Sequence, residues 1–123
     1  MNRITKRKTL FVDDEKPLCD AVSASLAGAG FDVLAVADAS QAMLQAEDPA
    51  LGLIIVDQDL AGESGVMLTK FLRWNHPEVP TIIYTSPEHE ADTTSHTRNR
   101  RADQCLPKGS IEKLIAHVGH YIS

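Results

Sequence analysis

The feature that most constrains the fold is the apolar run at residues 53–56, which leads directly into Asp57 and a loop with Gly62 and Gly65. Four branched apolar residues in succession, bounded by turn signals, are typical of a strand buried on both faces, as in parallel sheets. Asp57 then lies at or just beyond the carboxyl end of a central strand. Open α/β sheets bind their ligands at that edge, so Asp57 is a candidate for chemistry as well as for a simple cap.

Short apolar runs alternate with helical patterns along the whole chain. The runs predict five strands, at residues 9–12, 31–36, 51–56, 81–84 and 104–106. Alternation of this kind requires a parallel sheet with helices on both faces, and right-handed crossovers leave few topologies. We therefore expect a doubly wound α/β domain with the flavodoxin-like strand order 2-1-3-4-5.

Helix signals occupy the stretches between the strands. Pro17 suits the first turn of a helix that stops near Gly28, and Asp38 opens a capping box for a helix that ends before Pro49. A third helix carries an apolar stripe of Leu68, Phe71 and Leu72, and we expect Trp74 near its end to pack. Ser110 is positioned to cap the last helix, whose apolar positions are Ile111, Leu114, Ile115, Val118 and Ile122.

Composition narrows the function classes. The 123 residues are one domain's worth of chain, and the net charge of -5 argues against a broad grip on nucleic acid or an anionic membrane. Residues 1–7 are basic and read as an N-terminal extension, which leaves 8–123 as the folded domain. Neither a membrane-spanning apolar stretch nor a signal-peptide pattern is present, so we expect a cytoplasmic protein.

In the expected topology, polar groups that follow four strands meet at one edge of the sheet. They are Asp13, Asp14, Asp57, Thr85 and Lys108. Carboxylates this close repel one another unless a cation neutralises them, and Mg²⁺ prefers oxygen ligands of this kind. A lysine can pair with a phosphate and a hydroxyl can donate to a phosphoryl oxygen. Together these parts suit phosphoryl transfer through an aspartyl phosphate.

With these residues in place, the sequence resembles the response regulator receiver domain of two-component signalling, over residues 8–122. The marks of the resemblance are the acidic stretch 13–15, the turn from Asp57 to Gly65, the stretch 76–86 and the sequence 106–108. The resemblance implies that Asp57 accepts a phosphoryl group. It also implies that Asp13 and Asp14 bind Mg²⁺, with Asp57 and the backbone carbonyl of Asp59 as further ligands.

By the same resemblance, Thr85 corresponds to the switch hydroxyl and Lys108 to the phosphate-pairing lysine. The implied phosphoryl donor is a histidine kinase or a histidine phosphotransfer protein, and the implied recipient is a downstream protein or a fused output domain. Beyond self-catalysed phosphoryl uptake and hydrolysis, no enzymatic activity is expected. The pattern suits a stand-alone receiver or a segment of a longer regulator, and it leaves the oligomeric state open.

Four departures from the family pattern concern the output rather than the phosphorylation chemistry. Cys105 stands where the family usually has an aromatic residue that turns with the switch, and Gly109 replaces the proline that normally follows the lysine. Ala61 stands where a proline commonly stiffens the loop. The stretch 86–101 is far more polar than the fourth helix of a receiver.

Two other readings are compatible with the residues. In a haloacid dehalogenase-like phosphatase, Asp57 and Asp59 would form a D-x-D motif, but that motif normally follows the first strand, whereas here Asp13 and Asp14 come first. The other reading is a pseudo-receiver, a protein-interaction module that keeps the fold without using phosphate. Cys105 and Gly109 favour it slightly.

The polar stretch 86–101 generates a prediction of its own. Its only ordinary apolar side chains are Pro87 and Ala91, so it has no stripe with which to dock a helix, and its threonines have modest helix propensity. We expect a short, frayed helix or a mobile loop. Amide hydrogen exchange there should be much faster than in the last helix, and equal protection of the two would contradict the prediction.

Overall fold

The computed structural model describes residues 8–60, 63–85 and 104–122. Its strands are β1 (Lys8–Val12), β2 (Asp32–Val36), β3 (Leu51–Asp57), β4 (Asp59–Leu60), β5 (Glu63–Ser64), β6 (Thr81–Thr85) and β7 (Gln104–Pro107). Its helices are α1 (Lys16–Gly28), α2 (Ala39–Gln45), α3 (Gly65–Asn75) and α5 (Ile111–Tyr121). The five long strands match the five predicted from the apolar runs to within one residue at each end.

These five strands form one parallel sheet in the order β2-β1-β3-β6-β7. Counting only the long strands, this is the predicted order 2-1-3-4-5. Strands β4 and β5 form a separate antiparallel pair of two residues each. The apolar runs did not predict this pair, because two-residue strands carry no periodicity.

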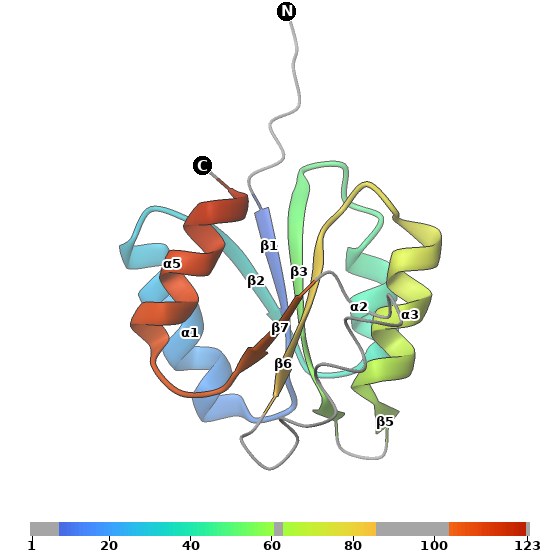
Figure 1. Cartoon of the computed structure of the whole chain (residues 1–123), viewed down its shortest axis with the longest axis horizontal. Coiled ribbons are helices and arrows are strands. Elements are labelled where there is room, and N and C mark those ends of the chain that lie inside the picture. The colour runs from blue at the N-terminus through green and yellow to red at the C-terminus, as the bar shows by residue number, and fades with distance from the viewer. Residues whose placement is uncertain (1–7, 61–62, 86–103, 123) are drawn as a thin grey trace, which may run out of the picture.

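Helices cover both faces of the sheet, as the alternation of elements requires. Figure 1 shows α1 and α5 on one side of the sheet and α2 and α3 on the other. Alternate side chains of a strand point to opposite faces, so the sheet divides the apolar interior into two clusters. Phe11, Leu53 and Ile55 pack on the α1 and α5 side, whereas Leu10 and Ile54 pack on the α2 and α3 side. The doubly wound α/β fold is confirmed.

Side-chain caps define where the helices begin. Asp38 Oδ1 accepts from the Gln41 N–H at 2.8 Å, and Gln41 Oε1 accepts in return from the Ala37 N–H at 3.0 Å. Ser110 Oγ accepts from the Lys113 N–H at 3.4 Å, which confirms the predicted cap of the last helix. The bonds donated by Gln41 and Lys113 satisfy N–H groups that the first turn of a helix leaves without an intrahelical partner.

The expectation that Trp74 packs is wrong. Its side chain is 86% exposed, and Phe71, which the apolar stripe placed inward, is 48% exposed. Helix α3 buries Leu68 and Leu72 against the sheet. Trp74 is two residues beyond Leu72 and therefore lies roughly 200° around the helix, on the solvent side.

Several sequence expectations concern residues outside the described ranges. They are the basic extension at 1–7, the position of Ala61, and the weak fourth helix at 86–101. Within the described ranges, no helix is long and apolar enough to cross a lipid bilayer.

The burial difference within α3 predicts opposite costs for two truncations. Leu72→Ala should lower the free energy of unfolding by about 2–5 kcal/mol, because it leaves a cavity in a packed core. Trp74→Ala should change it by less than about 0.5 kcal/mol, because the side chain is exposed. Urea unfolding followed by circular dichroism measures both, and a comparable loss for Trp74→Ala would show that the ring packs.

Candidate functional site

The alternation of side chains along the strands brings three of the predicted site residues together. Asp13 follows β1, Asp57 ends β3 and Lys108 follows β7. Each lies two positions beyond a residue of the cluster on the α1 and α5 side, namely Phe11, Ile55 and Leu106. Residues two apart in a strand share a face, and parallel strands end at the same edge, so the three side chains converge on one face at the carboxyl edge.

Lys108 is the centre of this group. Its Nζ lies 3.0 Å from Asp57 Oδ1 and 3.2 Å from Asp13 Oδ2, which makes two ion pairs with one ammonium group. Both carboxylates are buried, with exposed side-chain fractions of 6% for Asp57 and none for Asp13. Buried charges are costly unless they are paired, so Lys108 compensates both.

Backbone donors orient the two carboxylates. The Glu15 N–H donates to Asp13 Oδ1 at 2.9 Å, and the Asp59 N–H donates to Asp57 Oδ1 at 3.3 Å. The Cys19 thiol donates to the backbone carbonyl of Asp13 with a sulfur–oxygen distance of 3.0 Å. The two backbone bonds orient the side chains of Asp13 and Asp57 from the residues that follow β1 and β3, and the thiol holds the backbone of Asp13.

The charges of the cluster shift its titration. Burial raises the pKa of Asp57, the hydrogen bond to Lys108 opposes that shift, and the charge of Asp13 adds to it. Burial alone would lower the pKa of Lys108, but its bond to Asp57 and the charge of Asp13 outweigh burial and raise it. Burial, helped by the charge of Asp13, raises the pKa of Cys19 to about 11, so this thiol stays protonated at neutral pH.

The carboxylates suit a hard divalent cation such as Mg²⁺. One oxygen from each of Asp13, Asp14 and Asp57 lies within 4.8 Å of the other two. Mg²⁺ is held in proteins by one or two carboxylates together with other oxygen ligands, which this group of three oxygens could supply. Asp13 Oδ2 is buried, and its partner among the described residues is the ammonium of Lys108. Lys108 pairs with two of these three carboxylates, Asp13 and Asp57.

Thr85 and Gly65 belong to the same edge of the sheet. Thr85 is 1% exposed, and its carbonyl accepts from the Lys108 N–H, so β6 fixes the backbone of the lysine. A Cβ added at Gly65 would lie 1.8 Å from the carbonyl oxygen of Asp57, so only glycine allows the loop to return this close to β3. Of the predicted residues, Asp13, Asp14 and Asp57 have carboxylate oxygens within 4.8 Å of one another, and Lys108 pairs with Asp13 and Asp57. Thr85 joins them through its backbone.

Two residues that contact the site had no predicted role. Cys19 binds the carbonyl of Asp13, and the ring of Tyr84 lies near Lys108. The helical spacing of Leu18, Val22 and Leu26 placed Cys19 beside an apolar stripe, where a thiol reads as a packed hydrophobe. From the sequence, Tyr84 was interpreted as one more apolar residue of a strand. Its ring lies near Lys108 because of the register between β6 and β7, which cannot be predicted from the sequence pattern.

Comparison with known protein families agrees with this geometry. The family model described as "Response regulator receiver domain" matches residues 9–119. The chain belongs to the response regulator receiver family. It is thus a receiver domain of two-component signalling, as the acidic residues, Asp57 and the sequence up to Lys108 led us to expect.

Solved receiver domains have the same fold. The receiver domain of NtrX from Brucella abortus is 26% identical with a TM-score of 0.83, covering 93% of this chain and 97% of that one. The receiver domain of Francisella response regulator 1452 is 23% identical, with a TM-score of 0.84 and coverages of 94% and 96%. A CheY-like receiver from Methanospirillum hungatei is 21% identical, with a TM-score of 0.81 and coverages of 96% and 94%. The last two proteins are less than 25% identical to this chain, so their similarity is evidence for the fold alone.

Membership in the family carries general properties. Receiver domains act in signalling and are generally not enzymes, they bind Mg²⁺ at an acidic pocket, and they interact with kinases and output domains. In this receiver the acidic group that could hold the metal consists of Asp13, Asp14 and Asp57.

The raised pKa of Asp57 predicts the effect of removing its charge. A carboxyl whose pKa is higher in the folded than in the unfolded state contributes stability at acid pH, and this is lost as the pH rises through the folded pKa. At pH 7.5 without Mg²⁺, Asp57→Asn should therefore raise Tm. A gain of about 1 kcal/mol corresponds to about 4 °C for a domain of this size.

Differential scanning calorimetry checks this prediction, with Asp32→Asn as the control for an exposed carboxylate at the opposite end of the sheet. Mg²⁺ should raise Tm of the unsubstituted protein more than that of Asp57→Asn. A lower Tm for Asp57→Asn without Mg²⁺ would show that the ion pair with Lys108 outweighs desolvation and repulsion.

Proposed function

We propose that this receiver accepts a phosphoryl group on Asp57 and thereby switches its binding to a partner. The observation that carries the proposal is the ammonium of Lys108 held between two buried carboxylates, 3.0 Å from Asp57 and 3.2 Å from Asp13. A nucleophilic carboxylate, a second carboxylate for a metal and a cation that can pair with phosphate are the parts of phosphoryl transfer.

The transfer follows from the roles of the residues. An ionised Asp57 oxygen attacks the phosphorus of a phosphohistidine, a P–O bond forms, the P–N bond breaks, and the imidazole leaves with the electron pair and takes up a proton. Lys108 moves from the free carboxylate to a phosphoryl oxygen, and Thr85 donates its hydroxyl to another. Attack by water on phosphorus later restores the Asp57 carboxylate and releases inorganic phosphate.

The metal would be held by Asp13, Asp14, Asp57 and the backbone carbonyl of Asp59. When bound, Mg²⁺ supplies positive charge that lowers the repulsion between the carboxylates and the incoming phosphoryl oxygens. The protein's own contribution is to orient Asp57 and to place Lys108 against it, which opposes the rise in the pKa of Asp57 that burial causes. The N–H of Asp59, bound to Asp57 Oδ1, leaves the other carboxylate oxygen for attack.

The assignment of Asp57 as the phosphoryl acceptor also suggests the partners and the compartment of the protein. We propose a histidine kinase or histidine phosphotransfer protein as donor, and a downstream protein or fused output domain as recipient, in the cytoplasm. Nucleic acid and membrane are not proposed as partners, given the net charge of -5. We assign residues 8–123 to the receiver and 1–7 to a basic extension.

Intact mass after incubation with acetyl phosphate and Mg²⁺ tests the proposal. We expect a gain of one phosphoryl group, lost in Asp57→Ala and when Mg²⁺ is removed by a chelator. Asp32→Ala, which removes an exposed carboxylate at the start of β2, should be labelled like the unsubstituted protein. Lys108→Ala should be labelled slowly or not at all, because the phosphoryl oxygens lose their cation.

The opposite result has a definite meaning. A folded protein that gains no mass with either acetyl phosphate or a phosphorylated histidine phosphotransfer protein would contradict the proposal. The protein would then be a pseudo-receiver, and Asp57→Ala should bind partners as the unsubstituted protein does.

A further inference from the structure

Helix α3 has a second apolar side, which points away from the sheet. Met67 is 62% exposed, and Phe71 and Trp74 are exposed as well. Their spacing of i, i+4 and i+7 places the three side chains within an arc of about 60° around the helix. Leu68 and Leu72 lie on the opposite side and belong to the core. The exposed residues therefore form an apolar stripe, two turns long, on the solvent side of α3.

This stripe has the composition and spacing of an interaction surface. A single exposed apolar residue is ordinary in a folded protein, and a surface helix usually carries polar residues opposite its packed side. Here a methionine, a phenylalanine and a tryptophan share the solvent side. Helices that dock on a partner use anchors at i, i+4 and i+7, and tryptophan is enriched among the residues that carry binding energy.

The charges of α3 indicate which kind of partner fits. Lys70 is exposed and lies beside the stripe, three residues after Met67 and four before Trp74. Arg73 is the other charged residue of this helix, which has no acidic one. With histidines neutral, α1 and α5 each combine one basic and one acidic residue, and α2 has neither. Among the described helices α3 is thus the basic one, and its charge favours an acidic partner segment.

A second copy of this chain fits the stripe poorly. In a pair of identical subunits related by a two-fold axis, residues close to the axis face their own copies. Lys70 lies near the middle of the stripe at 67–74, so a pair centred on the stripe would bring two ammonium groups together. Like charges placed against each other weaken an interface. A different chain with a carboxylate at this position would instead gain an ion pair.

We propose that Met67, Phe71 and Trp74 form a docking surface for an amphipathic helix of a partner protein, with acidic side chains beside its apolar positions. The apolar residues of the partner cover the stripe, and one of its carboxylates pairs with Lys70. This surface is on the α2 and α3 side of the sheet, whereas the acidic site faces α1 and α5 (Figure 1). Docking on α3 therefore does not depend on phosphorylation of Asp57.

The test uses two fluorescently labelled synthetic peptides that form amphipathic helices with leucines at i, i+4 and i+7. One carries glutamates beside the leucines and the other carries lysines. In fluorescence anisotropy titrations, the acidic peptide should bind the protein about fivefold more tightly than the basic one. Trp74→Ala should weaken binding of the acidic peptide about tenfold, because it removes the largest anchor. The exposure of Trp74 means that this variant keeps its fold.

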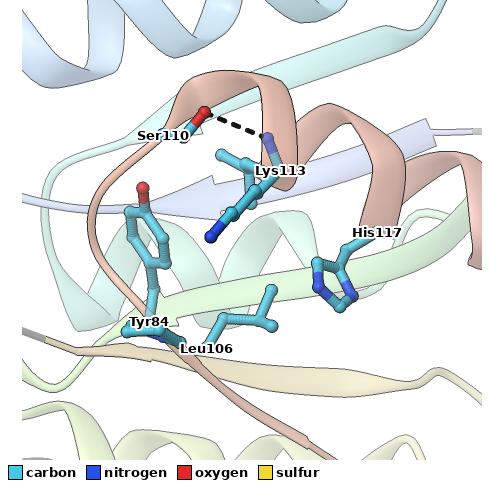
Figure 2. Close-up of a pocket in the computed structure, with 7 residues that line it drawn as sticks. Tyr84, Leu106, Ser110, Lys113 and His117 are labelled. Atoms are coloured by element: carbon cyan, nitrogen blue, oxygen red, sulfur yellow. Dashed lines mark hydrogen bonds between the residues drawn. The ribbon is translucent and has the colours of Figure 1, made fainter.

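Charge reversal separates a specific ion pair from a general electrostatic attraction. Lys70→Glu should reverse the preference, so that the basic peptide binds more tightly than the acidic one. Lys113→Glu is the matched control, because Lys113 is also an exposed lysine on a helix. It lies in the first turn of α5, where it lines a pocket with Tyr84 and Leu106 on the other side of the sheet (Figure 2). This control should keep the original preference, and equal effects of the two reversals would overturn the proposal.

Tryptophan emission reports the contact itself, because Trp74 is the single tryptophan of the chain. The unlabelled acidic peptide should shift the emission of Trp74 to shorter wavelength as the indole leaves water. Unchanged emission at saturating peptide, or equal binding by Trp74→Ala and the unsubstituted protein, would overturn the proposal.

Other occupants of the stripe give different results. Sedimentation of the unsubstituted protein as a dimer, with Trp74→Ala as a monomer, would assign the stripe to a second copy and overturn the proposal. A shift of Trp74 emission by phosphatidylserine vesicles, without one by the acidic peptide, would assign it to a membrane surface and overturn it as well. We expect a monomer and no shift with vesicles.

Discussion

One ammonium group shared by two buried carboxylates is the interaction on which the site depends. Lys108 lies within ion-pair distance of both Asp13 and Asp57, and neither carboxylate has more than a small exposed fraction. Without the lysine, these charges would face each other in a region of low dielectric, where repulsion is strong. The same lysine must release Asp57 when a phosphoryl group arrives. A contact that stabilises the resting site is therefore also the contact that the reaction exchanges.

The sheet separates this site from half of the core. Phe11, Ile55 and Tyr84 pack with α1 and α5 on the face that carries Asp13, Asp57 and Lys108, whereas α2 and α3 pack on the other face. The ring of Tyr84 lies on this same face, with its centroid 5.8 Å from the Lys108 Nζ. Cys105, where the family usually has an aromatic residue, leaves Tyr84 as the aromatic ring that touches the lysine in the described part of the chain.

Sequence reasoning located the parts of the site whose position follows from strand ends. Each of Asp13, Asp57 and Lys108 closes an apolar run, and the strand order then brings them together. Contacts between residues of different strands were harder to predict, because the proximity of Tyr84 to Lys108 depends on the register between β6 and β7. The exposure of Trp74 was missed for another reason: helix α3 has apolar residues on its solvent side as well as on its packed side. The pattern alone did not show which face would be buried.

The alternation of side chains between the two faces of the sheet also determines where this protein tolerates insertions and deletions. Asp57 faces α1 and α5 because it lies an even number of residues beyond Leu53 and Ile55. Deleting one residue from β3 would turn Asp57 to the opposite face, away from Lys108, and would exchange the two sets of core residues at the same time. A residue added between Gly28 and Phe31, in the turn after α1, would change no strand phase. Over evolutionary time, insertions and deletions should therefore accumulate in such turns and be nearly absent from β1, β3 and β7.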